Sequence, residues 1–316
     1  MKTHITRRTF CHSIGSGFAL ASFADGFAQV AKDRPDGLTL GIGNYGMQSY
    51  KTEEAIKLIA DLKYDALELT VMPEWDSSAH KMTEERRGLV RKMLGETGLS
   101  LTSLMENLTP SVVDVDHQKT LERLKLAAEL GHDLAPDSPP LIQTVLGGGD
   151  WSDKKELYRD RLGDWRRIAE STKTIIAIKP HRSGAMSQPD QAAWLLEQLG
   201  SSHWMGMIYD YSHYAMRGLS VAETVKTAFP ATVQIVVKDV AKNGDQFEFA
   251  LPGEANTFDH ADVLASFYKS GYRRSVCCEV SSQVFRRPGY DPTAAAKACY
   301  DFMSRVFEKA AVPRRK

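Results

Sequence analysis

The stretch MGMIYDYSH, residues 205–213, is an apolar, strand-like run that ends on the ionisable residues Asp210 and His213. Three further runs have the same form: TIIAIKPH (174–181), TVQIVVKD (232–239) and SVCCE (275–279). A parallel α/β barrel places its catalytic residues at the C-terminal ends of buried strands. The alternative is that these strands end in polar residues only because the chain meets solvent there. The regular repetition favours the barrel.

The same alternation extends along the chain from residue 38. Earlier strands are expected at 38–42, 66–71, 99–105 and 141–146. Helices with 3.6-residue apolar spacing are expected at 52–62, 83–97, 116–130, 154–173, 189–199, 220–229, 259–270 and 291–311. Such βα units build a parallel sheet. No linker interrupts residues 38–312, so we predict a single α/β domain, a (β/α)₈ TIM barrel.

Three long connections follow predicted strands, at residues 72–82, 241–258 and 281–292. We interpret them as loops of the C-terminal face, where barrel enzymes vary their specificity. The glycines at 147–149 could cradle a phosphate or form a tight turn after a strand. The turn is favoured, because no Lys-Ser/Thr pair follows as in a P-loop.

The composition limits the classes of partner. The chain has 316 residues, 42% of them hydrophobic and 25% charged, which is typical of a globular protein. Lys and Arg number 40 and Asp and Glu also 40, so the net charge is zero and no basic field indicates nucleic acid. No run reaches the roughly 18 apolar residues of a membrane span. The expected partner is therefore a small molecule, with neither nucleic acid nor membrane.

The N-terminus resembles an export signal. The sequence TRRTF at 6–10 is a twin-arginine pattern, and a mildly apolar stretch follows at 13–24. Small residues up to Ala28 fit a cleavage site. We therefore expect residues 1–28 to be a twin-arginine signal peptide, residues 29–37 a short leading segment, and the mature protein to be periplasmic or otherwise exported.

Several other residues are interpreted as structural. Cys277 and Cys278 are neighbours on a strand and point to opposite faces, so they cannot easily pair. We expect them to be buried apolar residues, as is Cys299. Three histidines at predicted helix ends or in loops are read as surface residues: His132, His203 and His260.

The period-2 alternation of a strand decides which strand-end residues face the barrel mouth. Lys179 and His181 share a face with Ala177, and Asp210 shares one with Ile208. By the same count, Lys238 lies on the face of Val236 and Glu279 on the face of Cys277. We therefore expect two carboxylates, two lysines and one or two histidines to converge.

Such a cluster suits two kinds of chemistry. Carboxylates and imidazoles can transfer protons or hold a divalent metal ion. Close opposite charges also perturb one another's pKa values, as catalytic groups require. For Asp210, Lys238, Glu279 and the strand-two residue Glu68, a purely structural role is the alternative.

The chain resembles the xylose isomerase-like TIM-barrel superfamily over nearly all of residues 38–310. The resemblance lies in Ala66-Leu-Glu68, Asp210-Tyr-Ser-His213, Val236-Val-Lys238-Asp239, Pro252-Gly253-Glu254 and Glu279. The superfamily includes sugar isomerases, epimerases and endonuclease IV. Residues 72–73, 104–108, 162–165 and 288–292 resemble a planctomycete-type, twin-arginine-exported group described as sugar phosphate isomerases/epimerases. An endonuclease is disfavoured by the neutral charge and the lack of a histidine-rich ligand set.

The resemblance implies a metal site that this chain matches only in part. The related epimerases hold Mn²⁺ or a similar ion with a Glu, an Asp, a His and a Glu from strands five to eight. Asp210 and Glu279 match, but Lys179 and Val236 occupy the other two positions. A divalent metal (Mn, Mg or Zn) would then need His213 or His181 as a replacement ligand. Alternatively, Lys179 stands in for the metal charge.

The resemblance also implies the chemistry: a proton is removed next to a sugar carbonyl and returned elsewhere. We assign Glu279 as the base, Lys179 as the electrophilic stabiliser and His181 as a further catalytic residue. A Schiff base on Lys179 ranks lower. Expected substrate-binding residues are Glu68, Glu106, His213, Lys238 and Glu254.

The predicted function is a sugar isomerase or epimerase acting on a sugar or sugar derivative. The alternatives are a lyase or dehydratase acting on a keto-sugar, and a carbohydrate-binding barrel that has lost catalysis.

Overall fold

Eight parallel strands close into a barrel in the order β1-β10-β7-β6-β5-β4-β3-β2. The computed structural model describes residues 36–244 and 246–315. The barrel strands are β1 (Thr39–Gly43), β2 (Ala66–Thr70), β3 (Ser100–Met105), β4 (Leu141–Thr144), β5 (Ile176–Ile178), β6 (Met205–Tyr209), β7 (Thr232–Val237) and β10 (Ser275–Cys278). The predicted (β/α)₈ TIM barrel is therefore confirmed. The predicted signal peptide at 1–28 lies outside the described residues.

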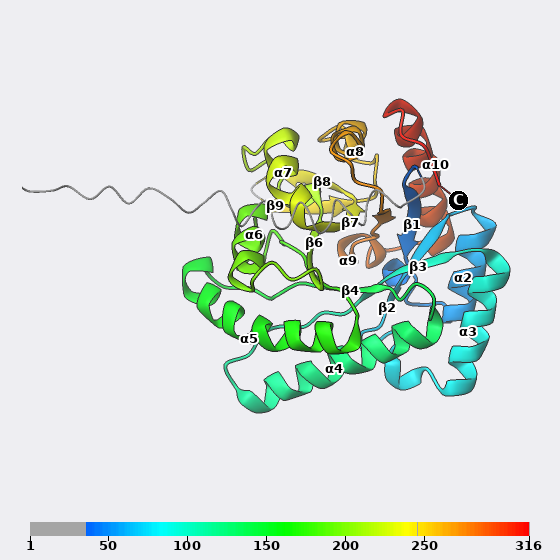
Figure 1. Cartoon of the computed structure of the whole chain (residues 1–316). Coiled ribbons are helices and arrows are strands. Elements are labelled where there is room, and N and C mark those ends of the chain that lie inside the picture. The colour runs from blue at the N-terminus through cyan, green and yellow to red at the C-terminus, as the bar shows by residue number, and fades with distance from the viewer. Residues whose placement is uncertain (1–35, 245, 316) are drawn as a thin grey trace, which may run out of the picture.

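A helix follows each barrel strand and packs against the outside of the barrel (Figure 1). The helices are α2 (Thr52–Asp61), α3 (Glu84–Thr97), α4 (Asp114–Leu134), α5 (Trp151–Thr172), α6 (Pro189–Gln198), α7 (Val221–Ala228), α8 (His260–Lys269) and α10 (Pro292–Lys309). The two longest, α4 and α5, lie side by side along one flank. The bounds of all eight helices agree with those expected from the sequence to within a few residues.

Capping residues explain where the helices begin and end. The side chain of Asp291 accepts the N–H of Thr293 at 2.9 Å, and Pro292 fills the first position of α10. Helix α3 ends at Gly98, whose φ of 71° is left-handed. Such a conformation favours glycine, because a Cβ would crowd the backbone there.

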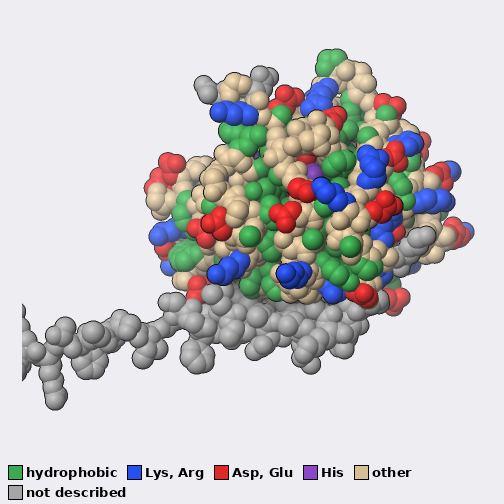
Figure 2. All heavy atoms as spheres, turned by 90° about the horizontal axis from the view of Figure 1, so that it is seen from above, with side chains coloured by type: hydrophobic (Ala, Val, Ile, Leu, Met, Phe, Trp, Pro, Cys, Tyr) green, Lys and Arg blue, Asp and Glu red, His purple; other side chains and the backbone are tan. Residues whose placement is uncertain are grey.

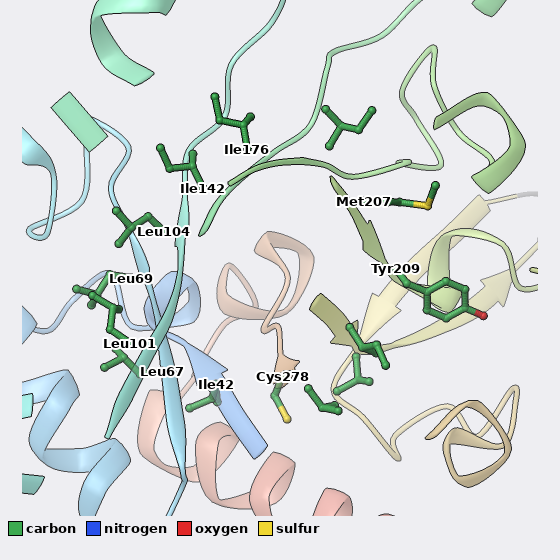
Figure 3. Close-up of a cluster of buried hydrophobic side chains, with 14 of the residues drawn as sticks. Ile42, Leu67, Leu69, Leu101, Leu104, Ile142, Ile176, Met207, Tyr209 and Cys278 are labelled. Atoms are coloured by element: carbon green, nitrogen blue, oxygen red, sulfur yellow. The ribbon is translucent and has the colours of Figure 1, made fainter. Parts of the chain in front are cut away.

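The apolar residues of the strands form two layers. Alternate residues point outward and pack under the helices, among them Leu69, Leu104 and Ile142 (Figure 3). The other residues fill the inside of the barrel: Leu141, Ala177, Ile208, Val233, Val236 and Cys277. The strand parity predicted from the sequence is thus confirmed for the residues that lead to the site.

The predicted long loop at 241–258 is wrong over its first part. Residues there form an antiparallel hairpin of β8 (Asp239–Asn243) and β9 (Gln246–Ala250). A signal for it was present, because the sequence Gly244-Asp245 is typical of a two-residue hairpin turn, and polar and apolar residues alternate in β9. A short helix, α9 (Ser282–Phe285), likewise interrupts the predicted loop at 281–292.

The three glycines after β4 behave as a turn. Gly147 and Gly149 have φ values of 88° and 115°. The carbonyl of Gly147 accepts the N–H of Ala185 at 2.9 Å. A Cβ on Gly147 would come within 2.7 Å of the Thr109 side chain, so the turn has no room for a larger residue.

The surface matches the neutral charge of the chain. Figure 2 shows acidic and basic side chains intermixed over one face of the molecule. Within the described ranges, no helix combines the length and apolar character that a bilayer crossing demands.

Close packing inside the barrel gives a first prediction. A Cβ added to Gly206 in β6 would lie 2.6 Å from Cγ1 of Val233 in β7. We expect Gly206→Ala to lower the free energy of unfolding by about 1–3 kcal/mol, because both strands are held by the barrel and cannot separate. Urea denaturation measures this loss. The double variant G206A/V233A should lose less stability than the two single variants lose together. Losses that simply add would contradict the proposed clash.

Candidate active site

Four charged side chains meet at the C-terminal ends of four neighbouring strands. Lys179 follows β5, Asp210 follows β6, Lys238 follows β7 and Glu279 follows β10. All four are buried, with exposed fractions of 9% or less. We call them the ion-pair quartet. The convergence expected from strand parity is what the structure shows for these residues.

Each lysine of the quartet bridges both carboxylates. Lys179 Nζ lies 2.6 Å from Glu279 Oε2 and 3.0 Å from Asp210 Oδ2. Lys238 Nζ lies 2.9 Å from Glu279 Oε1 and also contacts Asp210 Oδ2. Two positive and two negative charges therefore cancel within one buried cluster. Buried ions tolerate loss of water only when they are paired in this way.

The pairing determines the protonation states. Burial would raise the pKa of Glu279, but the ammonium groups of Lys179 and Lys238 lower it to about 2. The same two groups outweigh burial at Asp210 and hold its pKa well below the usual value. Burial would lower the pKa of Lys179, yet the two carboxylates raise it above the normal range. Lys179 is thus a stable ammonium and cannot readily act as a Schiff-base nucleophile.

His213 supports the quartet from one side and is fully buried. Its Nδ1 accepts the backbone N–H of Arg182 at 3.1 Å, so the ring proton belongs on Nε2. Nε2 lies 3.3 Å from Asp210 Oδ2 and can donate to it. Burial, and then the charge of Lys238, hold the pKa of His213 well below its usual value, so the ring stays neutral.

His181 lies beside His213, with ring centroids 4.2 Å apart, and is less buried. Its Nδ1 is 2.9 Å from the Ser183 hydroxyl. Burial and the nearby charges of Lys238 and Lys179 lower the pKa of His181 to about 4. At neutral pH it is therefore a neutral imidazole at the edge of the site.

The β8–β9 hairpin forms a roof over this part of the site. The ring of Phe249 lies 4.9 Å from Lys238 Nζ and 4.9 Å from the ring of His213. A cation over an aromatic face is stabilised by the ring quadrupole. Arg287 fixes the roof, because it binds Glu248 at 3.3 Å, and it also binds Glu254 at 3.2 Å.

Glu68 occupies a second buried polar cluster inside the barrel, with 1% of its surface exposed. Its Oε2 accepts the hydroxyl of Ser103 at 2.6 Å and the amide of Gln143. Gln234 in turn donates to Ser103 at 2.9 Å. Burial, only partly offset by the Ser103 hydrogen bond, raises the pKa of Glu68 to about 7.

Two predicted substrate-binding residues have partners outside the quartet. Glu106 is buried at the end of β3 and pairs with Arg123 of α4. Glu254 is partly exposed, accepts the N–H of Leu251 at 2.9 Å and pairs with Arg287. Both carboxylates have local structural partners.

The interpretation of His260 as a surface residue is wrong. It is 2% exposed and its Nε2 lies 2.5 Å from Asp239 Oδ1. The other oxygen of Asp239 accepts backbone N–H groups of the following loop, from Gly253, Ala255 and Asn256. Asp239 therefore anchors the Pro-Gly-Glu loop, a role that the charge pattern alone did not reveal.

Sequence reasoning missed an aromatic wall beside the quartet. Tyr45 follows β1, stacks on Trp75 with centroids 5.2 Å apart, and meets Phe285 edge-on at 5.1 Å. Burial, and then the nearby charge of Glu279, raise the pKa of the Tyr45 hydroxyl. The rule that residues after barrel strands face the site could have found Tyr45.

The quartet does not fit a divalent metal ion. An ion between Asp210 and Glu279 would lie at contact distance from two ammonium groups, which repel it. Val236, at the position expected for a histidine ligand, lies in the apolar barrel interior. Both nitrogens of His213 are already engaged. Over the ranges described, no three His, Cys, Asp or Glu side chains form a metal-binding group.

A cavity of about 550 Å³ lies at the opposite end of the barrel. Residues at or before the starts of the strands line it, including Thr39, Ser100 and Ser275. In barrel enzymes that face contributes to stability, whereas chemistry takes place at the C-terminal face. The quartet, and not this cavity, is the candidate active site.

Comparison with solved structures supports the same architecture. The 3-keto-D-glucoside 4-epimerase of E. coli is 15% identical, with a TM-score of 0.66, covering 86% of this chain and 99% of that one. A zinc-bound IolI protein is 15% identical at a TM-score of 0.70, covering 86% and 99%. The D-psicose 3-epimerase of Clostridium cellulolyticum, solved with D-tagatose, is 15% identical at 0.67, covering 85% and 99%.

At such identities the likeness shows the fold alone, and no curated protein sequence matches the chain. A family model gives the relationship directly. The model of the xylose isomerase-like TIM barrel matches residues 56–305, which is most of the barrel. The chain therefore belongs to the xylose isomerase-like TIM-barrel family.

Proposed function

We propose that this protein is a sugar isomerase or epimerase that removes a proton next to a keto-sugar carbonyl and uses lysine ammonium groups in place of a metal ion. The ion-pair quartet supports this proposal. It places a carboxylate, Glu279, between two fixed positive charges at the catalytic face of the barrel. Two structural neighbours are epimerases, of a 3-keto-glucoside and of D-psicose.

The quartet can stabilise the charge that the reaction creates. Removing a proton next to a carbonyl leaves an enediolate, whose negative charge develops on oxygen. Lys179 and Lys238 can donate to that oxygen, and the buried site makes such donation strong. The carbon-bound proton moves to Glu279, which becomes neutral, while the enediolate takes over as counter-charge of the two lysines. The total charge of the site is unchanged.

Substrate binding has to activate the base. With a pKa of about 2 in the free protein, Glu279 holds protons too weakly to remove one from carbon efficiently. A substrate oxygen that accepts N–H donors of Lys179 would loosen the lysine's hold on Glu279. The pKa of Glu279 would then rise only when substrate is present.

The tight pairing of Glu279 also favours a second candidate, a carbohydrate-binding barrel without catalysis. A carboxylate held by two lysines is a good hydrogen-bond acceptor for sugar hydroxyls even if it never takes a proton. In that case the aromatic wall around Tyr45 and Trp75 would pack against the sugar ring. Proton exchange separates the two candidates.

We expect the purified protein to incorporate deuterium from D₂O into a keto-sugar at the carbon next to the carbonyl. Proton NMR on D-tagatose and on a 3-keto-glucoside measures this exchange. Glu279→Gln should slow it by roughly 10²–10⁴-fold, since the amide cannot accept the proton. Glu197→Gln, at an exposed position of α6, is the matched control and should leave it unchanged. Binding of either sugar without exchange would favour the binding barrel.

The ammonium substitution predicts that no metal is required. Mass spectrometry should find Mn, Mg and Zn well below one ion per purified chain, and exchange should survive EDTA. The double variant with Lys179→Glu and Val236→His restores the ligand types of the related epimerases. It should gain stoichiometric Mn²⁺, because one repelling charge is replaced by a ligand. Stoichiometric metal in the unmodified protein would contradict the proposal.

The quartet should also be critical for stability. Lys179→Met leaves two buried carboxylates with one lysine, and we expect a loss of about 3–5 kcal/mol in the free energy of unfolding. Urea denaturation checks the loss. The double variant K179M/E279Q removes one charge of each sign, so it should lose less than the two single variants combined. Equal or larger losses would argue against charge balance as the cause.

A further inference from the structure

Glu68 is a buried carboxyl group that has no part in the quartet. Its side chain lies in the barrel interior on β2, almost completely removed from solvent. Within the part of the chain that the structure describes, no Lys, Arg or His forms an ion pair with it. Its hydrogen-bond partners are the neutral groups of Ser103 and Gln143. A carboxylate ion at this position would lack a counter-charge.

The strand register brings Glu68 level with Glu279. Gly43 pairs with Glu68 on one side, in the β1–β2 ladder. On the other side, Ile42 pairs with Cys278, so the same register places Gly43 beside Glu279. Gly43 has no side chain to fill the space between the two carboxyl groups. A Cβ there would lie 3.1 Å from Glu68 Oε1, so glycine leaves that oxygen free of a covering side chain.

Burial of Glu68 favours its neutral form, although the Ser103 hydrogen bond opposes it. The charges of Glu279, which follows β10, and of Lys179, which follows β5, both affect its pKa. Cys277 of β10 also lies close to Glu68, and burial keeps its thiol neutral. The adjoining residues of β1, β3 and β4 are Gly43, Ser103 and Gln143, none of which ionises. Burial is the largest effect and raises the pKa of Glu68 to about 7, with Glu279 adding to it and Lys179 opposing it.

We propose that Glu68 is a second catalytic carboxyl group, a neutral acid that works with the base Glu279. This rests on the proposed function. It answers a need of the reaction, because Glu279 cannot both take a proton from carbon and give one to the carbonyl oxygen. Below about pH 7 the resting site then contains one ionised and one protonated carboxyl group, which is the combination that acid–base isomerisation requires.

The proton transfers balance. Glu279 takes the proton from carbon, the two lysines stabilise the developing enediolate, and the Glu68 hydroxyl then gives its proton to the enediolate oxygen, which leaves a neutral enediol. In the second half, Glu68 takes a proton from an enediol oxygen and Glu279 returns its proton to carbon. Both carboxyl groups end as they began, and no oxidant or further reactant is needed.

The decisive experiment is the pH dependence of deuterium exchange into D-tagatose or the 3-keto-glucoside, with whichever substrate the wild-type protein exchanges. Because Glu68 must be protonated, kcat should fall as the pH rises through about 7. Glu68→Gln should slow exchange by roughly 10²-fold or more and abolish this fall. Ser103→Ala removes a hydrogen bond that lowers the pKa of Glu68, so the fall should move to higher pH.

Infrared spectroscopy tests the protonation state of Glu68 independently of activity. The infrared carbonyl stretch of a neutral carboxyl group should be present in the wild-type protein below pH 7, titrate away above it, and be absent in E68Q. In S103A it should persist to higher pH. A purely structural Glu68 would show the moved infrared titration in S103A without a matching move of the kcat profile.

The outcomes separate the two proposals. Exchange that continues in E68Q at the wild-type rate, with the same fall above pH 7, would overturn the role of Glu68 and leave the proposed function standing. A missing infrared band would also overturn it. No exchange by the wild-type protein, with the band present, would instead overturn the proposed function and, with it, the catalytic role of a carboxyl group shown to be protonated.

Discussion

Charge balance inside a closed barrel is the constraint on which this site depends. Four neighbouring strands of the barrel end in two lysines and two carboxylates that are buried together, and each charge is tolerated only because the others are present. His213 and Phe249 both contact this cluster, through Asp210 and Lys238 respectively. The same requirement explains why the quartet does not fit a divalent metal ion, since the two lysines already balance the carboxylates.

Strand ends made the architecture and the quartet predictable from sequence. In a parallel barrel, an apolar run followed by a charged residue indicates a buried strand whose C-terminal end lies at the active-site face. The two-residue period of a strand then decides which of these side chains converge. Lys179, Asp210, Lys238 and Glu279 were found in this way. Val236 occupies the position of a histidine ligand, which already indicated that this chain lacks part of the related epimerases' metal-ligand set.

Contacts between distant segments were not predictable in the same way. His260 begins a helix and has the local pattern of a surface residue, yet Asp239 draws it into a buried pair. Glu106 follows β3 in the same way that Glu279 follows β10. It forms an ion pair with Arg123 of α4, however, and is not part of the quartet. The hairpin is a different case, because the sequence Gly244-Asp245 carried the turn signal and the length of the predicted loop obscured it.

The role of Arg287 has a consequence for how the site opens. One guanidinium holds Glu248 of the roof and Glu254 of the loop that Asp239 anchors. The roof and the Pro-Gly-Glu loop are therefore mechanically joined, although they are successive rather than paired segments. Entry of a ligand would have to strain both together, so access to the quartet depends on a residue that touches none of its four members. Substitutions in this region could alter the residence time of a ligand without altering the chemistry.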